Sequence, residues 1–235
     1  MDVRVESLIE GARRAAGTVI VVDVFRAFTT AAIAFAHGAK AIVLVAEPAT
    51  ALALRSQGVG ELCMGEVDGR RPPGFDFGNS PYELSQAALH DKILIQSTRA
   101  GTVGVCAVAN SEALYAASLL TARATAQVVR ADAPALVTIV AMGSQGNRRT
   151  DEDEQCALYL RNLLLGRQPD RNAVRALVLS GAEAAKFDDP EQQHFHPKDR
   201  ELALAIDSLD FAIAVSQEHG LLVARPRVLP AAAGR

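Results

Sequence analysis

Two short runs of β-branched and other apolar residues, at positions 18–24 (TVIVVDV) and 136–142 (LVTIVAM), constrain the fold more than any other feature of the sequence. Neither run alternates apolar with polar residues, and this is typical of strands that are covered on both faces in a largely parallel sheet. The alanine-rich segment 26–37 follows the first run, with apolar residues at helical spacing and Gly38 as a C-terminal stop. These segments predict a strand–helix unit of the α/β type.

The same alternation continues along the chain and predicts the fold class. Further strands are predicted at residues 41–45, 61–64, 92–96 and 113–117, and further helices at 48–57, 81–89, 119–131 and 151–165, with one more beginning near Gly101 and a helix and strand pair closing the chain. We therefore predict an α/β fold with a largely parallel or mixed sheet that helices cover on both faces. Residues 1–168 are predicted to form the domain that carries the site. Residues 169–235 either pack on that domain or form a small C-terminal α/β subdomain.

The charge balance and the cysteines limit the partners and the compartment. With 24 basic and 27 acidic side chains, the net charge of −3 provides no general field for nucleic acid or an anionic membrane. The three cysteines are odd in number and far apart, so they favour a reducing cytoplasm over a disulfide framework or a zinc site. The N-terminal residues lack a basic segment followed by an apolar run, and no later stretch approaches 18 uninterrupted apolar residues. We expect a cytoplasmic protein in which an anionic ligand is bound by a local group of side chains and not by the overall charge of the chain.

Polar side chains directly follow several predicted strands, at the edge of a doubly wound sheet where ligands usually bind. They are Asp23, Arg26, Glu66, Thr98, Arg99, Gly143 and Ser144. A phosphomonoester needs cations around its oxygens, and a hard divalent ion needs carboxylate oxygens, so a mixture of both suits a metal-and-phosphate cleft. The alternative is that Asp23 caps the following helix and Arg26 forms an exposed ion pair.

The octapeptide at residues 74–81 (GFDFGNSP) is the most informative loop. Its two glycines permit positive φ angles, and Asp76 and Asn79 provide oxygen ligands. Ser80, Pro81 and Glu83 match the start of a helix with a capping box, and a helix N-terminus attracts anions. The alternative is that Glu83 satisfies the cap and Asp76 only closes a turn.

Two other segments could contribute to such a site. Residues 96–102 (QSTRAGT) place hydroxyl groups, an arginine and a glycine at a strand-to-helix junction, which predicts either a second anion cradle or a plain capped turn. The segment lacks the lysine and glycine spacing of a P-loop. The acidic run 151–154 opens a helix, where one or two of its carboxylates could bind magnesium or all four could simply be solvated. His194 and His196 have no carboxylate or cysteine at ligand spacing, so we do not expect a metal site there.

Taken together, these motifs resemble the family of magnesium-dependent 2-phosphosulfolactate phosphatases, which hydrolyse a three-carbon sulfonated phosphoester to sulfolactate in coenzyme M biosynthesis. The resemblance extends over residues 19–165. It rests on the segment DVFRA at 23–27, Gly65-Glu66, the GFDFGNSP loop, the segment 98–102, and Glu152-Asp153 followed by Cys156-Ala157.

The resemblance implies a magnesium-assisted attack of water on phosphorus in a small phosphorylated acid. The metal ligands are then expected among Asp23, Asp76, Glu152 and Asp153, and the catalytic residues among Asp23, Arg26, Glu66, Asp76 and Arg99. The groups expected to bind substrate are Asn79, Ser80, Thr98, Gly101, Thr102 and Ser144.

One departure from the family pattern leaves alternatives open. Residues 98–102 read TRAGT where the family usually has TTNGT, so Ala100 replaces an amide donor and acceptor. A related phosphatase with a different 2-phospho acid substrate, and a non-catalytic small-anion binding protein on the same scaffold, both remain alternatives. A nucleotide-dependent oxidoreductase is disfavoured because no G-x-G-x-x-G turn follows the first apolar run. The sequence does not determine the oligomeric state, although a symmetric homodimer is common for enzymes of this size.

Overall fold

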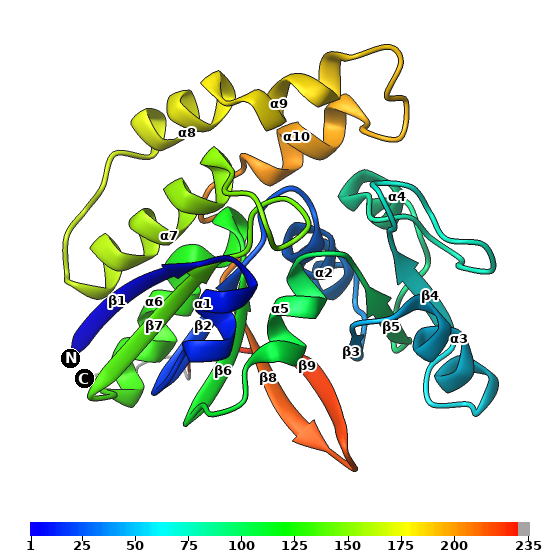
Figure 1. Ribbon diagram of the computed structural model, residues 1–235, viewed down its shortest axis with the longest axis horizontal. Coiled ribbons are helices and arrows are strands. Elements are labelled where there is room, and N and C mark those ends of the chain that lie inside the picture. The colour runs from blue at the N-terminus through cyan, green and yellow to red at the C-terminus, as the bar shows by residue number, and fades with distance from the viewer. Residues whose placement is uncertain (230–235) are drawn as a thin grey trace.

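One mixed sheet organises the chain in the computed structural model, which describes residues 1–229. Within these residues the sheet has nine strands in the order β1-β7-β2-β6-β8-β9-β3-β5-β4 (Figure 1). The strands are β1 (Asp2–Ser7), β2 (Thr18–Val22), β3 (Ala41–Val45), β4 (Leu62–Gly65), β5 (Ile93–Ser97), β6 (Ala113–Ala117), β7 (Leu136–Ala141), β8 (Ala212–Glu218) and β9 (Leu221–Arg227). This confirms the predicted α/β fold with a mixed sheet.

The sheet consists of two parallel parts that an antiparallel hairpin joins. Strands β1, β7, β2 and β6 pair in parallel, as do β3, β5 and β4. The hairpin β8–β9 lies between β6 and β3 and pairs antiparallel with both. His219 and Gly220 connect its strands with φ angles of 51° and 82°, the left-handed values that a tight hairpin turn requires. The C-terminal segment thus completes the main sheet.

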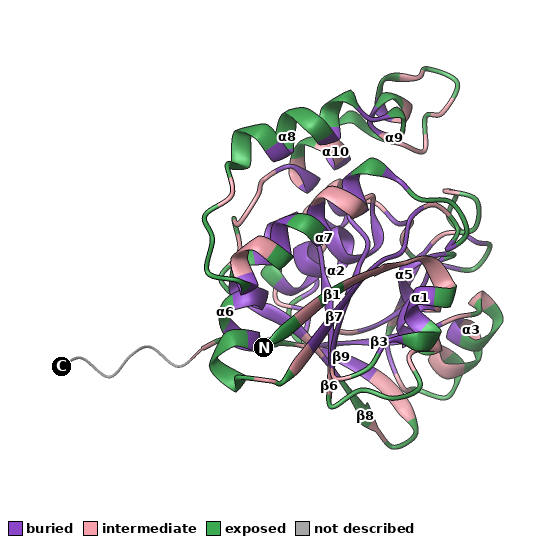
Figure 2. Cartoon of the chain, turned by 60° about the vertical axis from the view of Figure 1, so that its left-hand side comes forward, coloured by how far each residue is buried: buried purple, intermediate pink, exposed green. Residues whose placement is uncertain are grey.

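Helices cover both faces, because the side chains of each central strand point alternately to opposite sides. Val19 and Val21 of β2 belong to a core cluster with residues of α2 and α5, whereas Ile20 and Val22 belong to a second cluster with residues of α6 and α7. Figure 2 shows the central strands as a buried layer and α8 as largely exposed. The helices are α1 (Leu8–Arg14), α2 (Ala27–Ala36), α3 (Pro48–Ser56), α4 (Pro81–Ser85), α5 (Gly101–Ala107), α6 (Ala122–Asp132), α7 (Asp151–Leu164), α8 (Arg171–Ser180), α9 (Ala182–Ala185) and α10 (Pro197–Ala203), with 3-10 turns η1 (Leu119–Thr121) and η2 (Lys186–Asp188).

The structure adds elements that the sequence analysis did not predict. Strand β1 pairs along its full length with β7, and α1 follows it. The sequence of β1, DVRVES, alternates in the manner of an edge strand, so this signal was present in the sequence. Helix α4 ends at Ser85 rather than at residue 89. Beyond α7, helices α8, α9 and α10 form a layer above α7 and near α4 (Figure 1). Among the described residues, no helix combines the length and the hydropathy needed to span a bilayer.

Candidate active site

A cavity of about 210 Å³ lies beyond the carboxyl ends of β2, β4, β5 and β7. The main sheet contributes loop residues to it, and the segment after α8, residues 183–195, covers it from the opposite side. We call this segment the cap. The lining residues used below are Asp23, Arg26, Glu66, Asp68, Gly69, Asn79, Arg99, Ala100, Ser144 and Glu152 from the sheet side, and Glu183, Lys186, Gln192, His194 and Phe195 from the cap.

Asp23 is buried and lines the cavity. Its side-chain Oδ1 accepts a hydrogen bond of 3.0 Å from the backbone N–H of Ala27, the first residue of α2. The other oxygen lies so close to α5 that a Cβ atom on Gly101 would approach it to 2.9 Å, which explains the glycine at that position. Asp23 therefore binds the start of α2, as the helix-cap alternative predicted, and also lines the cavity.

Burial gives the carboxyls of this site unusual protonation behaviour. It raises the pKa of Asp23 to about 7, and the nearby Glu66 acts in the same direction, while the N–H groups of Ala27 and Gly101 oppose it. Burial likewise raises the pKa of Glu152 to about 7, with Glu183 and Asp23 adding to the effect. Carboxyls with perturbed pKa values that share one cleft are characteristic of functional sites.

Asp153 lies behind these residues rather than on the cavity wall. Its Oδ1 accepts from the N–H of Val24 at 2.7 Å, and its Oδ2 accepts from the N–H of Gly143 at 2.8 Å. The two bonds connect the loops that follow β2 and β7. Burial raises the pKa of Asp153 well above its ordinary value, and Glu152 and Asp23 raise it further.

Glu66 connects two further loops at the cavity edge. One carboxylate oxygen accepts from the N–H of Gly69 at 2.8 Å, and the other accepts from the N–H of Arg99 at 2.7 Å. Both Glu66 and Arg99 line the cavity, and the Arg99 side chain is exposed toward solvent. These bonds hold the turn before α5 against the loop after β4.

Asn79 is the member of the GFDFGNSP loop that reaches the cavity. The residue is buried, and its side-chain Oδ1 has no hydrogen-bond partner among the described residues. An unpaired buried amide oxygen costs free energy unless a ligand or ion satisfies it. A ligand or ion bound in the cavity would satisfy this oxygen.

Arg26 holds the cap rather than presenting a free cation to the cavity. Its guanidinium donates to the carbonyl oxygens of His194 at 2.7 Å and Gly69 at 3.1 Å, and it forms a buried ion pair with Asp199 at 3.0 Å. It also lies 4.5 Å above the ring centroid of Phe195. Asp199 is its ion-pair partner, so the exposed ion pair that the sequence offered as an alternative is replaced by a buried one.

Besides Gly101, four further residues of the predicted site do not line the cavity. The Asp76 carboxylate pairs with Arg55 at 2.7 Å and accepts from the N–H of Cys63 at 2.8 Å, so it closes the loop against β4, as the turn alternative predicted. Ser80 caps α4 and donates to Asp199 at 2.6 Å.

The other two are threonines that bond to each other. Thr98 accepts from the N–H of Thr102 at 3.1 Å, and the hydroxyl of Thr102 donates to the carbonyl of Thr98 at 3.0 Å. These bonds form the capped turn that opens α5. Within the segment 98–102, Arg99 and Ala100 therefore line the cavity. Gly101 packs closely against the side chain of Asp23.

The cap supplies residues that the sequence analysis did not select. Lys186 forms an ion pair with Glu183, which also binds Arg148 at 2.5 Å. Burial acts to raise the pKa of Glu183, but the hydrogen bonds from Lys186 and Arg148 outweigh it and leave that pKa below its ordinary value. Burial and the neighbouring cations Arg70, Arg26 and Lys186 lower the pKa of His194. The dense polar run 187–199 was the only signal in the sequence for this segment.

The charges that line the cavity suit a hard cation. Five lining side chains are carboxylates and three are basic: Asp23, Glu66, Asp68, Glu152 and Glu183 against Arg26, Arg99 and Lys186. Within residues 1–229, no three or more His, Cys, Asp and Glu side chains converge in a metal-ligand arrangement. The donor set nevertheless consists of carboxylate oxygens and the unpartnered Asn79 oxygen, and these are the atom types that hard divalent cations prefer.

The α/β sheet gathers carboxylates and basic groups around a small cavity, a combination that suits a phosphorylated substrate together with a divalent cation. A sequence model of the family described as 2-phosphosulpholactate phosphatase matches residues 4–205. The chain therefore belongs to this family, which confirms the resemblance inferred from its motifs, and it is a phosphoric monoester hydrolase by class.

Individual relatives agree with the family assignment. A protein of Bacillus subtilis (strain 168) named probable 2-phosphosulfolactate phosphatase is 33% identical over 202 residues, which cover 85% of this chain and 87% of that protein. Proteins with the same name from Thermus thermophilus and Pseudothermotoga lettingae are 37% and 38% identical over 135 and 138 residues. These two alignments cover 57% and 59% of this chain, and 56% and 58% of the relatives.

Proposed function

We propose that the chain hydrolyses 2-phosphosulfolactate to sulfolactate and phosphate in the 210 Å³ cavity, with Mg²⁺ as its cofactor. The observation that carries this proposal is the buried pair of carboxyls, Asp23 and Glu152, each with a pKa of about 7, beside the unpartnered Asn79 oxygen. A substrate with phosphate, carboxylate and sulfonate groups would be repelled by these carboxylates unless a cation lay between them. The family and the names of the relatives support the choice of substrate.

Magnesium fits the donor set better than a metal that needs an all-protein cage. It is usually bound through one or two carboxylates, together with water and phosphate oxygens of the substrate. We assign Asp23 and Glu152 as its carboxylates and Asn79 as a further oxygen donor. When bound, the ion would neutralise the phosphoryl oxygens and lower the pKa of water. Asp153 is assigned a positioning role, because its bonds to Val24 and Gly143 hold the loops that carry the other groups.

The basic side chains orient the substrate. Arg99 lines the cavity and is exposed to solvent. Its guanidinium can therefore approach the phosphoryl oxygens without breaking a buried ion pair. Lys186, which pairs with Glu183, lines the cavity from the cap and would bind a second anionic group of the substrate, while the Ser144 hydroxyl can donate a hydrogen bond. Water attacks phosphorus and loses a proton, the bond between phosphorus and the ester oxygen breaks, and a proton is returned to the ester oxygen, so that sulfolactate leaves as the alcohol. Arg26 acts indirectly by fixing the cap to the loop at Gly69.

A second substrate is favoured by one observation. Ala100 is buried and lines the cavity at the place where the family usually has asparagine. The missing amide removes one polar contact, which suits a 2-phospho acid with a less polar tail. Phospholactate is the simplest compound of this type.

Phosphate release from purified protein tests these proposals. We expect Mg²⁺-dependent release from 2-phosphosulfolactate, loss of release with a chelator, and loss in an Asp23→Asn variant. A preference for phospholactate that Ala100→Asn shifts back toward 2-phosphosulfolactate would support the second substrate. If neither compound nor phosphoglycolate releases phosphate while calorimetry detects binding of 2-phosphosulfolactate, the chain is a non-catalytic anion-binding protein and the enzyme proposal fails.

We propose further that the enzyme is cytoplasmic and forms a homodimer. Three cysteines without a disulfide among the described residues suit a reducing compartment. Sedimentation velocity tests the assembly, and a single species with the mass of one chain would contradict it.

A further inference from the structure

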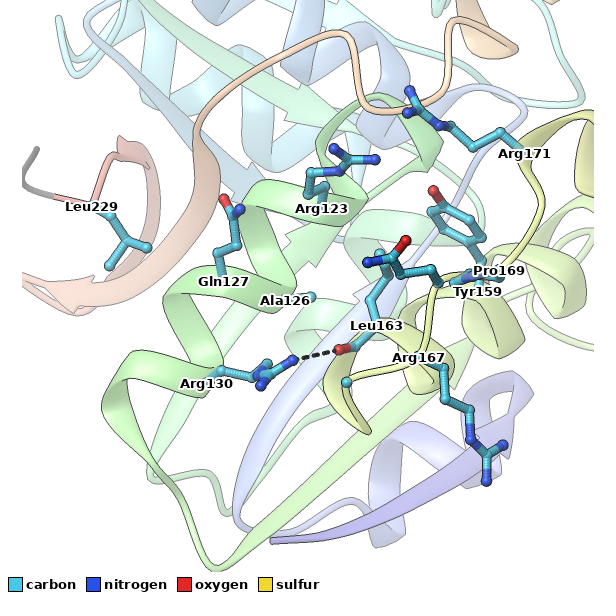
Figure 3. A pocket seen from close by; sticks show the side chains of 12 residues that line it. Arg123, Ala126, Gln127, Arg130, Tyr159, Leu163, Arg167, Pro169, Arg171 and Leu229 are labelled. Atoms are coloured by element: carbon cyan, nitrogen blue, oxygen red, sulfur yellow. Dashed lines mark hydrogen bonds between the residues drawn. The ribbon is translucent and has the colours of Figure 1, made fainter. Parts of the chain in front are cut away.

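A second and larger cleft lies away from the cavity described above. It has a volume of about 860 Å³, and none of its lining residues is shared with the 210 Å³ cavity. Helix α6, the C-terminal part of α7 and the loop that leads to α8 form its walls (Figure 3). The proposed three-carbon substrate is too small to occupy this volume, which is typical of sites for larger organic ligands.

Arginines dominate the polar lining of this cleft. Arg123, Gln127 and Arg130 lie along one exposed face of α6 because they are spaced by four and three residues, and Arg171 faces them from the start of α8 (Figure 3). Arg123 and Arg171 share one carboxylate, that of Asp207, at 3.2 and 3.8 Å.

Arg130 is the least compensated of these cations. Its Nη1 donates to the backbone carbonyl of Leu163 at 3.2 Å, and within residues 1–229 no carboxylate lies within ion-pair distance of it. Four arginines line the cleft, Arg167 among them, and within residues 1–229 the Asp207 carboxylate is their one ion-pair partner, which leaves about three positive charges there, although the whole chain has a net charge of −3. A local excess of arginine on an acidic protein is suited to bidentate binding of phosphate groups.

Part of the cleft lining is apolar. Ala126, Leu163, Pro169 and Leu229 contribute to it, and Tyr159 also lines the cleft, with its hydroxyl donating to Asp207 at 2.6 Å. A ligand that fits this lining carries two or more negative charges and a planar or apolar body. We propose that the cleft is a second anion site that binds a phosphorylated organic anion of nucleotide size.

Titration calorimetry with ATP, in the presence of a chelator, tests this proposal. Charge reversal at Arg130 is the main perturbation, because its side chain is exposed and its hydrogen-bond partner is a backbone carbonyl. Arg167→Glu is the matched control, since Arg167 lines the same cleft but its guanidinium points away from the other three in Figure 3. We expect Arg130→Glu to weaken ATP binding by about tenfold or more and Arg167→Glu to change it by less than about twofold.

A second variant, a second ligand and an activity measurement complete the test of the anion site. If Arg130→Glu does not fold, Arg171→Gln is used in its place and should likewise weaken ATP binding. Pyrophosphate, which lacks the organic body, should bind more weakly than ATP. Phosphate release in the cavity should change by less than about twofold in Arg130→Glu. The proposal is overturned if ATP gives no binding heat at about 1 mM, or if both reversals weaken binding equally. It is also overturned if Arg130→Glu alters only the sedimentation of the protein, because the cleft would then be an interface between copies.

Discussion

The stability of the metal-free protein should fall as pH rises through neutrality, because Asp23 is buried. Its pKa is about 7 in the folded chain and its ordinary value is 3.8, so between these values the folded state binds more protons than the unfolded state. Stability is therefore greatest below the ordinary value and is lost as pH rises through the folded value. The two pKa values differ by about 3, which corresponds to about 4 kcal/mol in total. About 2.5 kcal/mol of this stability is lost when the pH rises from 5 to 8.

An Asp23→Asn variant isolates this effect. Asparagine keeps the oxygen that accepts from Ala27 but cannot ionise. The decrease in the free energy of unfolding between pH 5 and pH 8 should therefore be about 2.5 kcal/mol smaller in the variant than in the parent protein. At pH 8 without metal it should be the more stable of the two by about 2 to 3 kcal/mol, because its new N–H group faces the backbone N–H of Gly101 and offsets part of the gain. It should also release no phosphate.

Urea unfolding followed by far-ultraviolet circular dichroism measures these differences, since the chain contains no tryptophan. Mg²⁺ should stabilise the parent protein more at pH 8 than at pH 5 and should stabilise Asp23→Asn much less. Asp210→Asn, at an exposed aspartate, serves as the control with the parent pH dependence. Equal pH slopes in the parent and Asp23→Asn proteins would refute the reasoning that Asp23 is buried in this way.

Three further predictions concern other parts of the site. Asp199→Ala should lower the free energy of unfolding by about 3 kcal/mol or more in urea titrations, because it leaves the buried Arg26 guanidinium without its partner; a loss below about 1 kcal/mol would contradict the buried pair. Asp76→Asn should change kcat by less than about twofold relative to the parent protein, since the Asp76 carboxylate binds Arg55 outside the cavity. A decrease of about 100-fold in kcat would show instead that Asp76 is a catalytic residue. Lys186→Met should raise KM about tenfold with little change in kcat if the cap binds a remote anionic group of the substrate, so an unchanged KM would argue against that contact.

The fold could be predicted from the sequence because its signals are local. The run at residues 18–24 contains β2, and the spacing of alanine and phenylalanine after it gives α2, since hydrophobic periodicity reports burial directly. The predicted strands 41–45 and 113–117 coincide with β3 and β6. The order of strands was not accessible in the same way. The insertion of the hairpin β8–β9 between β6 and β3 depends on pairing between segments far apart in the chain.

The octapeptide loop illustrates the limit for the site. Asp76 and Asn79 lie three positions apart and both provide oxygen atoms, so sequence alone offered no reason to prefer either. The folded loop directs Asp76 to Arg55 and the backbone of β4, whereas Asn79 is buried at the cavity with an unpaired oxygen. Side-chain direction within an irregular loop follows from long-range hydrogen bonds, which local propensity does not encode.

The sequence by itself determined the α/β class, the family, and the principle that carboxylates and basic groups gather at the carboxyl ends of the strands. Only the tertiary structure decided which of them face the cavity and which hold the fold. Arg26 and Asp199 are 173 positions apart, and their buried ion pair brings the cap over the site. Sequence spacing cannot reveal such a contact, because a buried charge acquires its partner only when the chain has folded around both.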